Sequence, residues 1–162
     1  MSHLKSIHVV VNDQPLTCSV EPRMHVIDMI REQLGLKGTH LGCEHGVCGA
    51  CSVEVDGRLV RGCLTLAVQT DGKAIRTVEG LSKLPEAQQL QKAFIKHNAL
   101  QCGFCTPGML MAAKELLQFK PDATRQEVRE WMSGNYCRCT GYHAIVDAVC
   151  EVLEQRRQEV NA

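Results

Sequence analysis

Four cysteines in the first half of the chain have the type and spacing of ligands to an iron-sulfur cluster. Their pattern is Cys43-x4-Cys48-x2-Cys51-x11-Cys63. The first three match the C-x4-C-x2-C run that holds a plant-type 2Fe-2S cluster through thiolates, and Cys63 follows as the fourth thiolate. Such a cluster carries electrons, so this stretch predicts a redox role.

Glycines surround these cysteines, at Gly35, Gly38, Gly42, Gly46 and Gly49. A loop can close around a compact cluster only where its backbone turns sharply, and glycine adopts positive φ angles without a Cβ clash. The exposed backbone N–H groups can then point at the cluster sulfurs and tune the reduction potential. Residues 35–63 are therefore predicted to form a cage around the cluster.

A second set of four cysteines lies in the second half of the chain, as Cys102-x2-Cys105 and Cys137-x-Cys139. Each pair falls in a loop between predicted helices, and antiparallel helices would bring both loops to one end of a bundle. Four converging thiolates suit a tetrahedral zinc ion or an iron-sulfur cluster, so the spacing alone leaves both open. One cluster already predicted in the chain favours a second, because two redox centres in series can pass electrons and a structural zinc ion cannot.

The ten cysteines of the chain also raise the alternative of a disulfide-rich secreted protein. Met1–Val20 lacks the cationic start, apolar core and cleavage site of an export signal, so we expect reduced thiols and a cytoplasmic protein. Cys18 and Cys150 lie outside both quartets and are expected to be small buried apolar residues. His45 lies inside the first loop, but four cysteines already serve that cluster, so we expect an exposed polar residue.

The elements that must position the first quartet form a sheet with one helix across it. Strands are expected at Ser6–Val11, Leu16–Val20, Ser52–Val55, Arg58–Val60, Leu64–Val68 and Ala74–Val78. Apolar residues fall on one helical face of Val26–Leu34, and Gly35 follows as a C-cap. Asp56-Gly57 is a strong hairpin signal, and this hairpin would carry Cys63 back to the other three cysteines.

The second half of the chain is predicted to be helical, because strand alternation stops between Glu79 and Pro85. We expect one domain at residues 1–79 and another at residues 80–162. Helices are predicted at Glu86–His97, Pro107–Phe119, residues 125–132 and Ala144–Arg156. Thr106 is expected to cap the second of them, with Pro107 at its first position. Thr124 and Glu127 form a capping box for the third, and the whole indicates an α+β protein.

Composition excludes several other classes of function. Lysine plus arginine and aspartate plus glutamate both number 18, which gives zero net charge, and no basic stripe favours nucleic acid or an anionic membrane. No apolar run is long enough to span a bilayer. With 44% hydrophobic residues the chain can build a core, and we expect it to associate with other proteins.

Taken together, the motifs resemble the small iron-sulfur subunit of the molybdenum hydroxylases. That family includes xanthine dehydrogenase, aldehyde oxidoreductase, carbon monoxide dehydrogenase and bacterial N-heterocycle hydroxylases. The resemblance covers nearly the whole chain and all eight cysteine positions. It is carried by CEHGVCGAC at residues 43–51, QCGFCTPG at residues 101–108 and NYCRCTGY at residues 135–142.

This resemblance implies a plant-ferredoxin-like β-grasp domain followed by a four-helix bundle. It implies two 2Fe-2S clusters that relay electrons between molybdopterin on a large partner subunit and FAD on a medium one, with no substrate chemistry on this chain. It also implies a dimer of heterotrimers. The remaining alternative is a freestanding ferredoxin whose helical domain is stapled by zinc and serves as an interaction module.

The resemblance assigns roles to individual residues as well. The cluster on Cys102, Cys105, Cys137 and Cys139 would lie next to the molybdopterin, and the cluster on Cys43, Cys48, Cys51 and Cys63 nearer the flavin. Gln101 matches a family glutamine that hydrogen-bonds the pterin. Cys139 matches the ligand cysteine that approaches it. The residues between the motifs identify no substrate.

Overall fold

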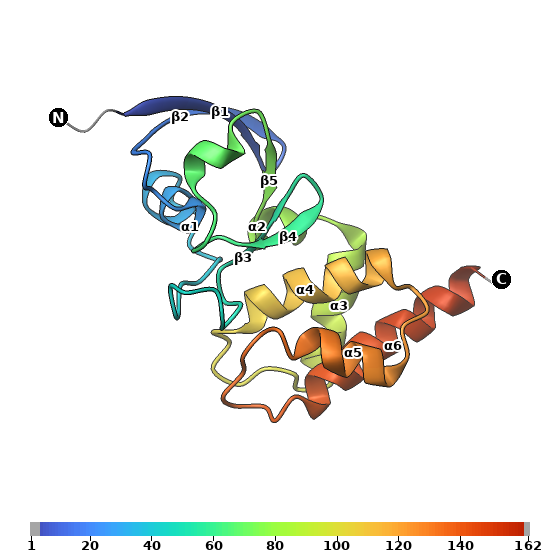
Figure 1. Ribbon diagram of the computed structural model, residues 1–162. Coiled ribbons are helices and arrows are strands. Elements are labelled where there is room, and N and C mark those ends of the chain that lie inside the picture. The colour runs from blue at the N-terminus through green and yellow to red at the C-terminus, as the bar shows by residue number, and fades with distance from the viewer. Residues whose placement is uncertain (1–3, 161–162) are drawn as a thin grey trace.

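A five-stranded mixed sheet forms the first half of the chain, in a computed structural model that describes residues 4–160 (Figure 1). Its strands are β1 (Lys5–Val11), β2 (Gln14–Val20), β3 (Ser52–Val55), β4 (Arg58–Arg61) and β5 (Ala74–Arg76). The order across the sheet is β2-β1-β5-β3-β4. The β1–β5 pair is parallel, and the other three pairs are antiparallel. We refer to residues 4–76 as the sheet half.

Two tight hairpins give the sheet its register, as the sequence predicted. Asn12 and Asp13 have φ angles of 50° and 68° between β1 and β2. Asp56 and Gly57 have φ angles of 47° and 79° between β3 and β4. Two consecutive positive φ angles are typical of the two-residue turns whose twist matches that of the paired strands. The second hairpin pairs Ser52 with Arg61 and so sets the positions of the cysteines on either side of it.

A helical segment crosses the sheet between β2 and the first cysteine loop, as expected. It begins as α1 (Val26–Asp28) and continues as a wider π-helical turn, Met29–Gln33. Gly35 follows with a φ of 69°, the left-handed conformation in which helices often end. Side chains of this segment and of the sheet form one core, which includes Val20, Val26, Met29, Ile30 and Val53.

The predicted strand at Leu64–Val68 is wrong. The chain instead turns after β4 and forms a 3-10 helix at Ala67–Thr70, and only Leu66 makes an isolated bridge, to His25. The reason is topological: β5 lies between β1 and β3, so the segment after β4 must cross the sheet to reach that position. Ala67 and Thr70 are buried along this crossing.

Helices form the rest of the chain, which we call the helical half. They are α2 (Val78–Leu81), α3 (Pro85–Lys96), α4 (Thr106–Phe119), α5 (Arg125–Met132) and α6 (His143–Val160). The short α2 was not predicted. The capping box at the start of α5 is confirmed, because Thr124 accepts from the Glu127 N–H and the Glu127 carboxylate accepts from the Thr124 N–H. The α+β class, with four longer helices after the sheet, is also as expected.

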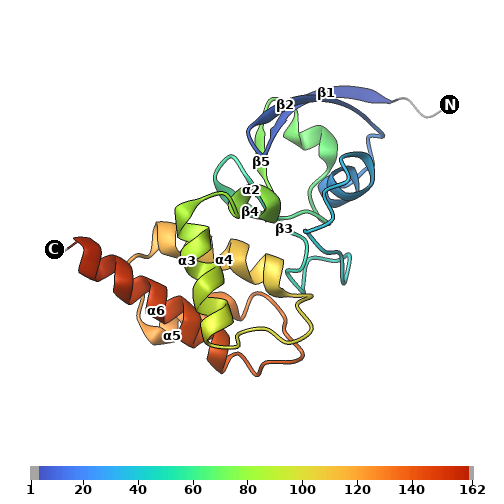
Figure 2. The ribbon, with the colours of Figure 1, turned by 180° about the vertical axis from the view of Figure 1, so that it is seen from behind.

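The helical half has its own apolar core. In this core α3 packs against both α4 and α6 (Figure 2). Its fully buried side chains include Leu90, Met109, Leu116, Met132 and Val149. The predicted start of α4 is wrong by one residue: Cys105 is the N-cap and Thr106 is the first helical residue. Thr106 therefore does not cap the helix.

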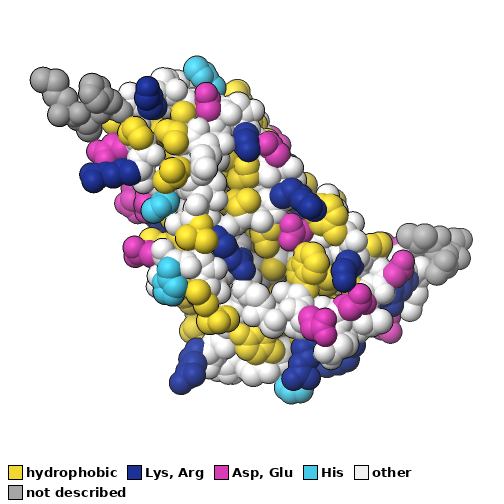
Figure 3. Space-filling model, viewed as in Figure 1, with side chains coloured by type: hydrophobic (Ala, Val, Ile, Leu, Met, Phe, Trp, Pro, Cys, Tyr) yellow, Lys and Arg dark blue, Asp and Glu magenta, His cyan; other side chains and the backbone are white. Residues whose placement is uncertain are grey.

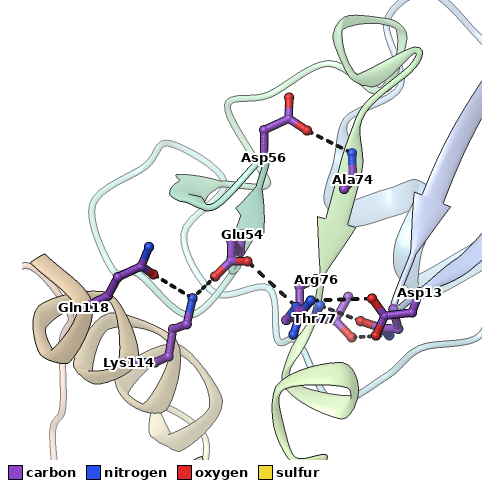
Figure 4. Close-up of polar contacts among 9 residues, drawn as sticks. Asp13, Glu54, Asp56, Ala74, Arg76, Thr77, Lys114 and Gln118 are labelled. Carbon is purple, nitrogen blue, oxygen red and sulfur yellow. Dashed lines mark hydrogen bonds and ion pairs between the residues drawn. The ribbon is translucent and has the colours of Figure 1, made fainter. Parts of the chain in front are cut away.

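A chain of charged side chains joins α4 to the sheet (Figure 4). Lys114 Nζ on α4 lies 2.5 Å from Glu54 Oε2 on β3, and Glu54 Oε1 lies 3.8 Å from Arg76 Nε on β5. The Lys114 and Glu54 side chains are only 11% and 14% exposed. Next to this pair, the Leu59 N–H of β4 donates to the Glu115 carboxylate at 2.8 Å.

Replacing Lys114 with methionine is expected to destabilise the protein by about 3 kcal/mol, because it leaves the Glu54 carboxylate poorly compensated in a mostly buried position. Thermal unfolding measures the effect. Lys120→Met is the matched control, since Lys120 is 45% exposed where it pairs with Glu127 and exposed pairs contribute little. Equal melting temperatures for the two variants would contradict a structural role for the Lys114 pair.

Charged side chains of both signs lie on the face of the molecule that Figure 3 presents. The basic and acidic side chains are interspersed over this face. Across residues 4–160, every helix is too short or too polar to cross a lipid bilayer.

Candidate metal centres

The first cysteine quartet is assembled by the loop after the π-helical turn and by the β3–β4 hairpin. Cys43 and Cys48 lie in the loop and are half-buried, whereas Cys51 and Cys63 flank the hairpin and are buried. The Gly62 N–H donates to the Cys51 carbonyl at 3.1 Å, which continues the ladder between β3 and β4. The hairpin therefore places Cys51 beside Cys63, as predicted.

Left-handed backbone conformations allow the loop to wrap. Gly46 and Gly49 have φ angles of 84° and 75°. A Cβ on Gly46 would lie 2.4 Å from the Leu64 side chain, and one on Gly49 would lie 2.5 Å from the Asn135 side chain. The positive φ angle thus favours glycine at both positions, and at Gly49 the buried Asn135 side chain also leaves no space for a Cβ. Within the loop, the Cys48 N–H points at Cys43 Sγ, 3.4 Å away.

The thiols of the first quartet differ in acidity. Backbone N–H groups at Cys48 and His45 lower the pKa of Cys43 to about 6, because they stabilise the thiolate. Burial, together with the neighbouring Cys63 thiol, raises the pKa of Cys51 to about 11. A cationic metal beside Cys51 would offset this penalty on its thiolate, so a buried thiol next to a second one fits a metal ligand.

The second quartet is assembled by the turn before α4 and the loop between α5 and α6. Cys102 Sγ and Cys139 Sγ are 3.5 Å apart. Burial and the adjacent Cys137 thiol raise the pKa of Cys105 to about 12. The structure therefore brings the four thiols together as two close pairs, Cys102 with Cys139 and Cys105 with Cys137.

Paired thiols fit a two-iron cluster, in which each iron takes two of the four protein ligands. In the described part of the chain, no group of three or more histidine, cysteine or acidic side chains is close enough to hold one metal ion. All ten cysteines lie in this part, and all are free thiols. Cys18 is buried, as expected, and Cys150 is half-buried in α6.

Hydrogen bonds that sequence reasoning missed support the second quartet. The Thr140 hydroxyl donates to Cys137 Sγ at 3.1 Å. The Tyr142 hydroxyl accepts from the Cys137 N–H at 2.9 Å and donates to the Asn135 carbonyl at 3.0 Å. The only signal in the sequence is a threonine and a tyrosine within three residues of a cysteine, which does not reveal which atoms they reach.

Gln101 lies on the surface beside the second quartet. Its side-chain Nε2 donates to the Cys139 carbonyl at 3.1 Å, and its side chain is exposed. Arg138, between the two cysteines of that loop, is exposed as well. The Gln101 amide and the Arg138 guanidinium are therefore both exposed to solvent beside the second quartet. His45 is also exposed, as predicted, and its ring nitrogen contacts the Cys43 carbonyl.

The loops of the two quartets pack against each other. In both ribbon views they lie on the same side of the molecule (Figures 1 and 2). The Tyr136 N–H donates to the Cys48 carbonyl at 2.8 Å, so one hydrogen bond links a cysteine of the first quartet to the residue before Cys137. The His40 ring stacks on Phe104 with centroids 4.7 Å apart, and His40 Nδ1 donates to the Phe104 carbonyl.

Comparisons with known families agree with two separate centres. Residues 9–82 match the family model described as a 2Fe-2S iron-sulfur cluster binding domain. Residues 77–150 match the model described as a 2Fe-2S binding domain. Each match contains one complete cysteine quartet, and both models describe domains that bind 2Fe-2S clusters.

Curated relatives cover almost the whole chain. It is 54% identical to the nicotine 6-hydroxylase small subunit of Paenarthrobacter nicotinovorans over 92% of this chain and 90% of the relative. It is 47% identical to caffeine dehydrogenase subunit gamma of Pseudomonas sp. (strain CBB1), over 90% and 89%. It is 41% identical to the nicotinate dehydrogenase small FeS subunit of Eubacterium barkeri, over 93% and 96%.

Solved structures share the fold. A chain of quinoline 2-oxidoreductase from Pseudomonas putida 86 superposes with a TM-score of 0.90 at 52% identity, over 97% of this chain and 98% of that one. Aldehyde oxidoreductase from Desulfovibrio gigas superposes with a TM-score of 0.87 at 40% identity, over 96% of this chain and 17% of that longer one.

Proposed function

The chain belongs to the small iron-sulfur subunits of the molybdenum hydroxylases, and from that membership we propose which of its residues carry the electron-transfer function. One 2Fe-2S cluster is held by Cys43, Cys48, Cys51 and Cys63. The other is held by Cys102, Cys105, Cys137 and Cys139. The observation that supports this assignment is the gathering of each quartet into close thiol pairs.

The chain is the electron-transfer part of a multi-subunit oxidoreductase. A bound 2Fe-2S cluster takes up or gives up one electron at a time. The protein's own contribution is to hold the thiolates, to bury Cys51 and Cys63 and to fix the distance between the two loops through the Tyr136–Cys48 hydrogen bond. The zinc alternative is not favoured, because the second quartet lies in a match to a 2Fe-2S domain.

The two ends of this relay face different partners in our proposal. The second quartet lies next to molybdopterin on a large subunit, where the exposed Gln101 amide would hydrogen-bond the pterin and Cys139 would be the nearest ligand. The first quartet lies nearer to FAD on a medium subunit. The Gln101 side chain already donates to the Cys139 carbonyl, which holds its amide at that edge of the second quartet.

The purified chain is expected to contain about four irons and four acid-labile sulfides, with two distinct EPR signals after reduction, because each quartet would hold one two-iron cluster. Metal and sulfide analysis combined with EPR measures this. A content of two irons and one zinc ion per chain would instead show that the helical half binds a structural zinc ion.

We propose further that the complex is a cytoplasmic dimer of heterotrimers that acts on an N-heteroaromatic compound, in line with the relatives named for nicotine, caffeine and quinoline. The chain itself would divide into domains at residues 1–79 and 80–162. Co-purification with the partner chains and assays against heterocycles, purines, aldehydes and carbon monoxide test the substrate class. Turnover of aldehydes or carbon monoxide alone would contradict it.

A further inference from the structure

The Thr106 hydroxyl is buried without a hydrogen-bond partner among the described residues. Only two other side chains in that range, Thr39 and Arg157, have a buried polar atom in this state. Thr106 directly follows Cys105 and is the first residue of α4. It is therefore the one of the three that adjoins a quartet cysteine in the sequence.

An unpaired hydroxyl at this position is unusual for two reasons. A helical threonine commonly donates to the carbonyl three or four residues earlier, but Thr106 makes no such bond. A buried polar group without a partner is also unfavourable, so native proteins nearly always supply one. The missing acceptor is expected to be a group that the polypeptide alone does not provide.

The position of Thr106 in the helix indicates where that acceptor lies. Side chains in a helix lean toward its N-terminus and cover the preceding turn. For Thr106 the preceding turn is the one that carries Cys102 and Cys105. Since the hydroxyl oxygen is buried, a partner docking from outside would not reach it. The group that belongs among the four thiols is the cluster.

A second threonine shows the same interaction already formed. The Thr140 hydroxyl donates to Cys137 Sγ at 3.1 Å and accepts from the Tyr142 N–H at 3.2 Å. Like Thr106, Thr140 directly follows a quartet cysteine. Cys137 and Cys105 are neighbours in the structure, so the hydroxyl of Thr140 bonds one thiol of the pair, and Thr106 directly follows the other.

We propose that Thr106 donates a hydrogen bond from its hydroxyl to a sulfur of the cluster held by the second quartet, and that this bond raises the reduction potential of the cluster. The proposal rests on the proposed function, in which that quartet binds a 2Fe-2S cluster. Reduction adds negative charge to the sulfurs, and a hydrogen-bond donor stabilises the more negative state. Thr106 thus acts as a positioning and tuning residue.

Thr106→Val keeps the shape of the side chain and removes the donor. At a fixed applied potential it should lower the ratio of reduced to oxidised second cluster about tenfold, which corresponds to a shift of about 59 mV for one electron. EPR-monitored redox titration of the full chain measures both clusters. The first cluster should keep its potential and serves as the internal reference. Thr106→Ser should keep the wild-type value, and Thr140→Val should shift in the same direction as Thr106→Val.

An unchanged potential in a fully loaded Thr106→Val protein would overturn the proposal. If this variant fails to load its second cluster, loading of Thr106→Ser is the deciding measurement. Normal loading of Thr106→Ser shows that the hydroxyl is needed, whereas failure of both variants shows that a hydroxyl is not sufficient at this position and overturns the proposal. Failure of the proposed function is separate, because wild-type protein would then lack a second iron-sulfur signal before any variant was made.

Discussion

Cys43→Ser is expected to remove about half of the bound iron and one of the two EPR signals, while the signal of the helical half persists. A neutral serine hydroxyl is a poor replacement for a thiolate ligand. The other quartet draws all of its thiols from the loops around α4 and α5, so it should still assemble. Iron and sulfide analysis with EPR of the reduced protein measures both centres.

The reciprocal variant, Cys137→Ser, should remove the other signal, and Cys150→Ser is the matched control. Cys150 is a half-buried cysteine of α6 outside both quartets, so its replacement should leave about four irons per chain. The Tyr136 N–H donates to the Cys48 carbonyl, so loss of one cluster should disturb the loop of the other. The line shape of the remaining EPR signal should therefore change slightly. Loss of both signals in Cys43→Ser would show that the two centres do not assemble independently.

Gly108→Ala is expected to separate the two halves at their closest approach. A Cβ on Gly108, in the first turn of α4, would lie 2.3 Å from the Gly49 carbonyl oxygen and 3.1 Å from the Asn135 side chain. Neither the helix backbone nor the loop backbone can move without displacing a quartet. Overpacking of this kind costs roughly 2 kcal/mol, which lowers the melting temperature by about 4–8 °C in a chain of this size.

Thermal unfolding measures the loss of stability, and the magnetic coupling between the two reduced clusters measures the change in their separation. Gly134→Ala is the control on the same interface. Its Cβ would meet the Trp131 carbonyl oxygen at 3.5 Å and the Arg61 guanidinium at 3.7 Å, which are ordinary contacts, so both readouts should stay close to wild type. A similar response in the two variants would mean that the contact between Gly108 and Gly49 does not set the geometry.

Local patterns predicted the parts of the structure that depend on local chemistry. The spacing of Cys43, Cys48 and Cys51 predicted a cage, and Asp56-Gly57 predicted the hairpin that brings Cys63 beside Cys51. Both depend on turns within a few residues, where glycine and aspartate decide the backbone conformation. The capping box at Thr124 was predictable for the same reason.

Features that depend on distant residues were not predictable in this way. Leu64–Val68 has the composition of a strand, but β5 takes the position beside β3, and only the whole sheet reveals that. Thr106 has the type expected of an N-cap, yet the cap is Cys105. The packing of Asn135 and Tyr136 against the first loop joins residues far apart in the chain, which no local pattern records.

The parallel pairing of β1 with β5 has a consequence for biosynthesis. Val10 pairs with Ala74 and Val11 with Ile75, so β1 is synthesised more than 60 residues before β5, its parallel partner. Long-range parallel pairings form slowly because the intervening loop must close first. A nascent chain stopped before Arg76 would keep one side of β1 unpaired and open to association. The sheet can therefore close only after the chain has been translated past Arg76.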